Sequence, residues 1–331
     1  MELNLIDRKI LYHLNLNSRQ SFSQIGKKIG IHKDRVARRV KNLLENQIIK
    51  FILCTNEYKL GFFYIRFCFT YQYVTPEIKN KIIGYFVKNK NVISVHESEG
   101  YYDLIVTMAV KNAPVFYPIW YNIFNKYRDY FSNLVVSIYC ETIEYKYSFL
   151  LDEKDNKRDD IIIFRRYDNG NIAQLDDLDY KILKLISNNV RMQTIEIAKK
   201  LNKTADTIQN RIKKLTKSGV ILGFRTAIDY SKIDYNLYRL QIFLKDSKKI
   251  QKIIKYLELN PNVIRRNIIL GNVDIEFLLF LKNQKELNAI INDLNSKFPG
   301  EIKNCIYITH TKTHKYQCIP EEYFSYNNHK N

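Results

Sequence analysis

The feature that most constrains this chain is that its sequence is written twice. Residues 6–49 align without gaps on residues 178–221, so each position has a counterpart 172 residues later. A second match follows at an offset of 171, where IIGYFVKNKNVI from Ile82 aligns with IIKYLELNPNVI from Ile253. Each repeat is far longer than the unit of a solenoid, so the pattern indicates duplication of a unit with two modules.

The first module has the pattern of three short helices. Apolar residues at helical spacing predict helices over about 4–16, 22–29 and 33–46, with Ser21 as the N-cap of the second. A short helix, a tight turn and a longer basic helix form a helix-turn-helix, whose last helix lies in the major groove of DNA. The strand-like runs IIKFILCTN and VILGFRTAI follow the two copies and fit a small wing or hinge strand.

The third helix of each copy carries the candidate DNA-binding residues. Cations contact phosphates or guanine edges, whereas Gln and Asn suit adenine. We therefore expect the copies to read unlike half-sites, or one copy to grip mainly the DNA backbone. The alternative is the solvated outer face of an amphipathic helix. The candidates are Lys33, Arg35, Arg38, Arg39 and Lys41 in the first copy, and Thr204, Thr207, Gln209, Asn210, Arg211 and Lys214 in the second.

The second module alternates strand and helix patterns in the order strand, helix, strand, strand, helix, strand. This is the ferredoxin-like order, which hosts many functions and selects none. The predicted class is α+β, with two winged helix-turn-helix domains alternating with two ferredoxin-like (βαββαβ) sandwich domains. The expected boundaries are 1–57 and 58–148 for the first copy, 149–174 for a linker, 175–230 and 231–320 for the second copy, and 321–331 for a tail.

Charge and composition indicate the class of partner. The net charge of +19 indicates a polyanion, either nucleic acid or an anionic membrane surface, and its concentration in the helix-turn-helix units favours nucleic acid. Five scattered cysteines make no disulfide framework. We see no signal peptide and no apolar stretch of about 18 residues, so we expect a cytoplasmic protein.

Several short motifs together resemble the Lrp/AsnC family of bacterial and archaeal transcription regulators. In the second copy they are DYKIL from Asp179, NVR from Asn189, IAKKL from Ile197, NRIKKL from Asn210 and GVILGF from Gly219. The first copy keeps DRKIL from Asp7, NSR from Asn17 and RRVKNL from Arg38, but departs at QIIKF from Gln47, where the family usually begins with Gly. Each motif alone is weak, but their order and doubling are specific.

The resemblance implies a winged helix-turn-helix joined to a ligand-sensing αβ sandwich called the RAM domain. Family members dimerise through this sandwich, and many bind amino acids there. The duplication would then supply a pseudo-dimer in one chain, which reads an imperfect palindrome of double-stranded DNA and leaves further self-association open. By the same resemblance, an effector would lie near Gly100, Asp103, Gly271 and Asp274, although Gly-x-x-Asp is also an ordinary turn.

Three alternatives accompany this interpretation. Sirohaem decarboxylases look similar but typically carry Arg-Arg-x-Gly where this chain has IKFI from Ile49 and ILGF from Ile221, so we expect no enzyme. A zinc site at Cys305, His310, His314 and Cys318 would have no established ligand spacing, so we expect no metal. A non-specific architectural DNA binder is the third alternative.

Overall fold

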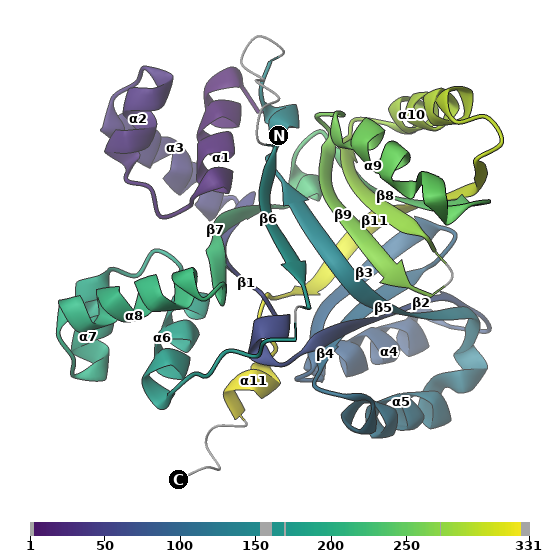
Figure 1. The fold of residues 1–331 in the computed structure, drawn as a ribbon, viewed down its shortest axis with the longest axis horizontal. Helices are drawn as coiled ribbons and strands as arrows, with labels where there is room; N and C mark the ends of the chain where they lie inside the picture. The colour runs from purple at the N-terminus through teal and green to yellow at the C-terminus, as the bar shows by residue number, and fades with distance from the viewer. Residues whose placement is uncertain (1–2, 153–160, 169, 272, 326–331) are drawn as a thin grey trace.

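Two three-helix units lie beside a large β-structure (Figure 1). The computed structural model describes residues 3–152, 161–168, 170–271 and 273–325. Each unit follows the predicted order of three helices. They are α1 (Leu5–Leu16), α2 (Phe22–Ile29) and α3 (Lys33–Glu45) in the first copy, and α6 (Asp177–Asn188), α7 (Thr194–Leu201) and α8 (Ala205–Lys217) in the second.

Local signals set the ends of these helices. The Ser21 side chain accepts from the backbone N–H of Gln24, which confirms Ser21 as the N-cap of α2. The helices α2 and α7 end at Gly30 and Asn202, where φ is 73° and 51°. Gly and Asn tolerate this left-handed conformation best, and the turn they make directs the chain into the third helix.

The second modules also have the predicted order. In the first copy they contain β2 (Phe63–Tyr71), α4 (Pro76–Lys88), β3 (Val92–Gly100), β4 (Leu104–Val110), α5 (Ala113–Tyr127) and β5 (Phe131–Tyr145). In the second copy they contain β8 (Asn236–Leu244), α9 (Ile250–Glu258), β9 (Val263–Leu270), β10 (Ile275–Leu281), α10 (Gln284–Lys297) and β11 (Ile302–Tyr316). This confirms two ferredoxin-like units.

The two sandwiches merge into one ring of strands. The first half of β5 pairs with β2 and its second half with β9, while β11 pairs first with β8 and then with β3. The ring runs β2-β4-β3-β11-β8-β10-β9-β5 and closes because β5 returns to β2. The apolar face of each sheet packs against its own helices on the outside, and the opposite faces of the two sheets meet inside.

The strands that follow the two helix-turn-helix units pair with each other. β1 (Ile49–Thr55) and β7 (Ile221–Ile228) form an antiparallel ladder in which Phe51 lies opposite Thr226. Of the two sequence alternatives, wing or hinge, the structure shows the hinge. In Figure 1 this ladder stands between the helical units and the ring of strands.

Packing between the two copies is crossed. The first helix-turn-helix core, around Ile10 and Leu14, includes Leu278 and Phe280 of the second sandwich. The second core, around Ile182, includes residues of the first sandwich such as Phe62. The domains therefore follow the expected order along the chain, but each helical unit rests on the sandwich of the other copy.

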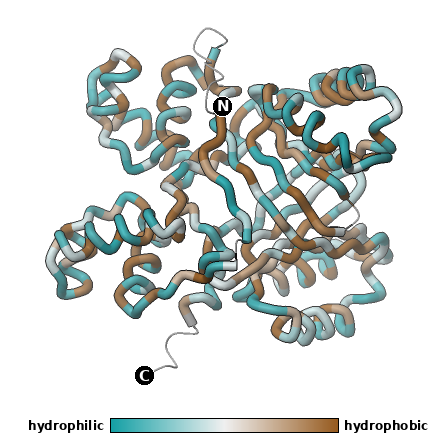
Figure 2. Tube along the Cα trace, in the orientation of Figure 1, coloured by the Kyte–Doolittle hydropathy of each residue, from teal (hydrophilic) through white to brown (hydrophobic). Residues whose placement is uncertain are grey.

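Two connecting segments are packed against the rest of the molecule, and the sequence predicted this for the apolar piece of the linker. Within the linker, β6 (Ile162–Tyr167) pairs with the second half of β5, so this apolar piece is packed. Part of the expected tail forms α11 (Glu321–Ser325), and Tyr323 is buried in the second helix-turn-helix core. The segment expected as a tail, 321–331, therefore begins with a packed helix, because Tyr323 has an apolar core to enter. Residues 153–160 and 326–331 lie outside the described parts. Figure 2 shows the underlying alternation of hydrophobic and hydrophilic residues along the helices.

Candidate DNA-binding face and central cavity

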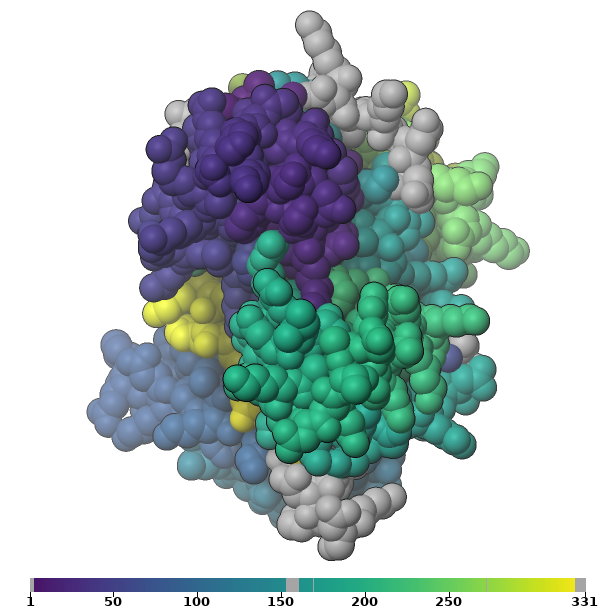
Figure 3. Space-filling view, turned by 90° about the vertical axis from the view of Figure 1, so that its left-hand side faces the viewer, coloured from purple at the N-terminus to yellow at the C-terminus, as the bar shows by residue number. Residues whose placement is uncertain are grey.

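The two helix-turn-helix units lie side by side on one face of the molecule. Figure 3 looks onto this face, with the first unit in purple above the second unit in green. The predicted recognition helices, α3 and α8, are therefore carried on the same side of the ring of strands. This placement is compatible with contact of both units with one ligand.

The helix α3 presents a basic outer surface. Val36, Val40 and Leu43 are fully buried, as the apolar stripe predicts. The opposite surface exposes four of the five predicted cations, which are Lys33, Arg35, Arg38 and Lys41. Lys41 makes a 3.7 Å ion pair with Glu45 at the surface, which is worth little in water. These cations are free to contact a polyanion.

Arg39 and its repeat counterpart Arg211 have a different environment. Arg39 Nη1 lies 2.8 Å from Asp7 Oδ1, and Arg211 Nη1 lies 2.5 Å from Asp176 Oδ2 and 3.3 Å from Asp179 Oδ1. Their side chains are 23% and 29% exposed. Each arginine therefore links the third helix of its unit to the start of the first helix of that unit. Contact of either arginine with DNA stays a prediction.

The helix α8 has Asn210 where α3 has Arg38, and Thr207 where α3 has Arg35. Gln209, Asn210 and Lys214 are exposed. The Thr204 hydroxyl is the N-cap and accepts from the backbone N–H of Thr207 at 3.2 Å, so it serves the helix end. Thr207 is half-buried. The structure thus brings the predicted residues together on each helix and leaves two chemically unlike outer surfaces.

Two equivalent arginines, Arg19 and Arg191, link the helical units to each other, and we call their contacts the clasp. The sequence interpretation missed this role. Arg19 Nη2 donates to the carbonyl of Met192 at 2.8 Å, and Arg191 donates to the carbonyls of Ser18 and Gln20, the latter at 3.1 Å. Arg19 also lies 5.0 Å from the ring centroid of Phe224. The available signal was the identical residue at equivalent positions of the repeat.

The two Gly-x-x-Asp turns are held by backbone contacts. Asp103 Oδ2 accepts from the N–H of Tyr71 at 2.7 Å, and Asp274 Oδ2 accepts from the N–H of Leu244 at 2.8 Å. Gly100 has φ of 107°, and a Cβ there would lie 3.0 Å from a backbone oxygen of β11. Gly is therefore required for the close approach of the two copies.

A cavity of about 540 Å³ lies between the β1–β7 ladder and the ring of strands. Its apolar wall includes Leu237, Leu278 and Phe280, and its polar wall includes His96, His310, Arg225, Arg239 and Arg265. Among the described residues of the two Gly-x-x-Asp turns, none contributes to this lining. The cavity is thus distinct from the effector position that the resemblance implies.

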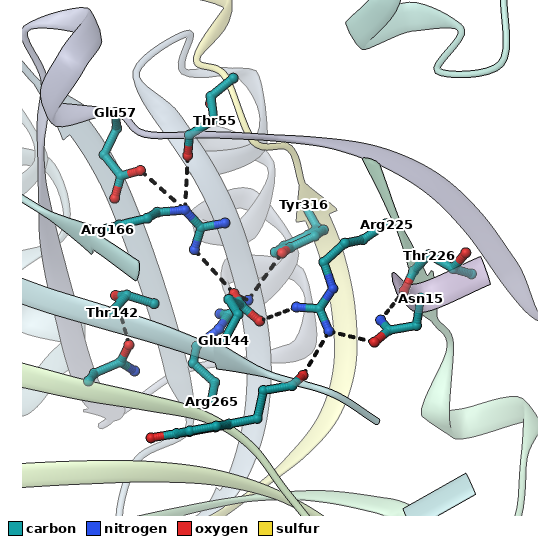
Figure 4. Close-up of polar contacts among 12 residues, drawn as sticks. Asn15, Thr55, Glu57, Thr142, Glu144, Arg166, Arg225, Thr226, Arg265 and Tyr316 are labelled. Carbon is teal, nitrogen blue, oxygen red and sulfur yellow. Dashed lines mark hydrogen bonds and ion pairs between the residues drawn. The ribbon is translucent and has the colours of Figure 1, made fainter. Parts of the chain in front are cut away.

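Three arginines surround one buried carboxylate at the edge of the cavity (Figure 4). Glu144 is approached by Arg265 at 2.6 Å, by Arg225 at 2.7 Å and by Arg166 at 3.1 Å. Burial alone would raise the pKa of Glu144, but the three guanidinium groups lower it from 4.5 to about 2. The carboxylate stays charged, and the cluster keeps an excess of positive charge.

A second buried carboxylate lies inside the ring. Glu276 is fully buried and accepts from Arg66 at 2.5 Å, from Asn267 and Gln241 at 2.9 Å each, and from Arg239. Arg239 Nε donates in turn to His310 Nε2 at 3.2 Å. Burial, followed by the positive charge of Arg239, lowers the pKa of His310 well below 6.5. His310 is therefore a neutral imidazole that carries its proton on Nδ1.

Within the described ranges, no three His, Cys, Asp or Glu side chains are grouped as metal ligands would be. Among the helices of the same ranges, none has the length and apolar character needed to cross a membrane.

Comparison with known proteins supports the helix-turn-helix assignment in both copies. Residues 3–44 match the AsnC-type helix-turn-helix domain, and residues 175–221 match a winged helix-turn-helix DNA-binding domain. A Pyrococcus abyssi protein named as an uncharacterized HTH-type transcriptional regulator is 35% identical over 122 residues, which is 83% of its length and 37% of this chain. The regulatory protein AsnC of Haemophilus influenzae is 31% identical over 79% of its length and 35% of this chain.

The whole two-copy architecture also occurs in a solved structure. The siroheme decarboxylase NirDL aligns over 98% of both chains with a TM-score of 0.62 and 13% identity, which shows a common fold. Both of these curated relatives are named as regulators, and DNA-binding domain models match both copies. The chain therefore belongs to the Lrp/AsnC family of helix-turn-helix transcriptional regulators and contains two copies of the family's unit.

Proposed function

We propose that this protein is a sequence-specific regulator that reads an imperfect palindrome of double-stranded DNA with two unlike recognition helices. The observation that carries the proposal is the pair of outer surfaces on α3 and α8. One exposes Arg35 and Arg38, and the other exposes Gln209 and Asn210. Arginine forms its best base contacts with guanine, whereas Gln and Asn form theirs with adenine.

The clasp between the helical units supports a two-site footprint. Arg19 and Arg191 bind backbone carbonyls across the junction, so the relative position of α3 and α8 is restrained before DNA arrives. A restrained pair of recognition helices favours half-sites at one fixed spacing, because ordering on binding then costs less. The net charge of +19 supplies the general attraction to phosphate.

Selection of bound genomic fragments at about 150 mM salt tests the proposal, because non-specific binding is weak there. We expect a discrete site with two unlike half-sites. Base preference in one half should change in Arg38→Ala and base preference in the other half in Asn210→Ala. The exposed Lys252→Ala on α9 is the matched control and should recover the unchanged site. Uniform recovery of fragments would indicate the architectural alternative instead.

An effector near the Gly-x-x-Asp turns is part of the same proposal. Its support is the family resemblance, together with the position of Gly100 and Gly271 where the two copies touch. A thermal-shift series with the individual amino acids tests it. A shift that is lost in Asp274→Asn would support the site. If no amino acid changes the melting temperature, the turns serve the structure of the strands.

The residues that line the cavity support a second candidate function, which is the binding of an iron tetrapyrrole. The neighbouring decarboxylase has also been solved with an iron-uroporphyrin III analogue. Arg225 and Arg265, which line the cavity, suit the carboxylates of such a tetrapyrrole. Titration with iron uroporphyrin should then give a change in the visible absorption band that Arg265→Gln weakens. An unchanged spectrum would dismiss this candidate.

A further inference from the structure

The repeat alignment gives the first-copy counterparts of the second-copy residues that line the cavity. Ala227, Asp229 and Tyr230 line the cavity, and their counterparts 172 residues earlier are Thr55, Glu57 and Tyr58. These counterparts are buried, and β6 of the linker contacts the first two of them. Arg166 of β6 donates to the Thr55 carbonyl at 2.9 Å and lies 3.5 Å from Glu57.

The cavity is therefore the second-copy equivalent of the place that β6 fills in the first copy. The duplicated unit offers two such places, but within the described residues one linker strand fills one of them. The strand pairing confirms the difference, since residues 141–145 of β5 have β6 on their outer edge. The equivalent residues 312–316 of β11 line the cavity instead, apart from Lys312.

The charge at the equivalent position is reversed. Glu144, which accepts from Arg166 in the first copy, corresponds to Lys315 in the second. The first-copy place thus holds acids that receive the guanidinium of Arg166. The cavity instead contains Arg225, Arg239 and Arg265, whose charges outnumber those of Glu144 and Asp229. A charge of the opposite sign suits this second place.

Unused hydrogen-bond donors in the cavity wall indicate the same chemistry. His310 is 3% exposed, and its Nδ1 has no hydrogen-bond partner among the described residues. Arg225 Nε and Arg265 Nε are buried and likewise lack a partner there. All three are donors, because His310 Nε2 already accepts from Arg239. A buried donor without an acceptor is costly, so an acceptor-rich ligand would remove the cost.

We propose that the cavity binds a small organic anion with an apolar body, in the place that β6 occupies in the other copy. The carboxylate or similar group would accept from Arg225, Arg265 and His310, and the body would pack on Leu278 and Phe280. The site is bounded by β1 and β7, which lead directly from the two recognition units, so occupancy would bias their positions. That last step rests on the proposed DNA-binding function, whereas ligand binding itself does not.

The test uses 8-anilinonaphthalene-1-sulfonate, an anion on an apolar body, with the full-length protein and without DNA. We expect fluorescence enhancement with one site per chain. Ala227→Phe, which fills the cavity, should abolish it, and Arg265→Gln should weaken binding roughly tenfold. Lys252→Gln on the outer surface of α9 is the matched charge control and should bind as the unaltered protein does. Circular dichroism melts establish that each variant is folded.

Competition then identifies the source of the anion. Displacement by citrate or by an amino acid would support a small effector, and displacement by iron uroporphyrin alone would support the tetrapyrrole candidate. Equal probe binding in Ala227→Phe and the unaltered protein would overturn the proposal, as would resistance to every carboxylate. If the probe binds at this site but no DNA site is recovered, the regulatory function fails while the cavity assignment stands.

Discussion

At the scale of single residues, some equivalent positions of the repeat carry the same amino acid in both copies, and others carry different ones. Arg39 and Arg211 are identical and make equivalent ion pairs with acids of the first helix. Arg38 has Asn210 as its counterpart, and both are exposed. The kept residues stabilise the unit, and we propose that the diverged surface residues distinguish different DNA sequences.

Replacing Arg39 and Arg38 separately should distinguish these roles. Arg39→Ala leaves Asp7, which is 5% exposed, without its ion-pair partner, so we expect the free energy of unfolding to fall by about 1–3 kcal/mol. Arg38→Ala should leave stability within about 0.5 kcal/mol and weaken DNA binding. Urea melts and fluorescence anisotropy measure the two effects. A salt slope reduced by about 1 in Arg39→Ala would show that Arg39 also contacts phosphate.

His310 should make the protein less stable in mild acid. Its pKa is lowered well below 6.5 in the folded state, so the unfolded chain binds a proton first as the pH falls. The free energy of unfolding therefore decreases as the pH falls below 6.5. The decrease is about 1.4 kcal/mol per pH unit as long as the imidazole of the folded protein stays neutral. In His310→Gln this slope should be smaller by that amount. The exposed His32→Gln is the control, and equal slopes in both variants would refute the assignment.

At the scale of elements, the two helix-turn-helix units act as one body through the clasp of Arg19 and Arg191. Each guanidinium satisfies backbone carbonyls of the other unit and stacks on an aromatic ring, Phe224 for Arg19 and Phe22 for Arg191. The β1–β7 ladder adds a second connection. The spacing of the recognition helices is thus set within the protein.

Loosening the clasp should affect two-site binding selectively. In Arg19→Ala/Arg191→Ala, the second half-site contact becomes less preorganised, so affinity for a complete site should fall roughly tenfold. Affinity for a duplex that carries one half-site should not change. Anisotropy with both duplexes measures this. An equal loss on both duplexes would mean that the arginines themselves contact DNA.

The sequence predicted elements well wherever local signals decide them. Helical spacing and caps such as Ser21 placed the recognition units, and alternation placed the ferredoxin-like strands. The β1–β7 pairing was not predictable, because partners such as Phe51 and Thr226 lie far apart in the chain and neither run specifies the other. The cavity was missed for the same reason, because His310 and Arg225 come to line one cavity only through tertiary packing. The sequence offered His310 only as a weak metal candidate.

At the scale of the whole molecule, one carboxylate joins the two copies. Arg66 of β2 and Arg239 of β8 occupy matching positions of equally long strands, and both bind Glu276. The position equivalent to Glu276 in the first copy is Ile105. Pairing of two first copies would bury two arginines without this acid. The network therefore disfavours the pairing of two first copies.

Glu276→Gln should accordingly destabilise the molecule strongly. It leaves two buried arginines without a negative partner, which typically costs about 3–5 kcal/mol. Ile105→Val, at the equivalent position, removes one methylene and should cost about 1 kcal/mol. Denaturant unfolding of both variants measures the difference. Similar stabilities would mean that the arginines find other acceptors.

The fusion of unlike copies has a consequence for geometry on DNA. A homodimer imposes two-fold symmetry, so its complex looks the same from both ends of the site. Here the continuous chain and the crossed packing place one α3 and one α8 in every molecule, so a single bound chain lacks that symmetry. A bound molecule would give its site a left and a right end. Another protein that approaches along the duplex would meet a different surface of the bound molecule from each direction. Inverting the site in place would therefore change the regulatory outcome.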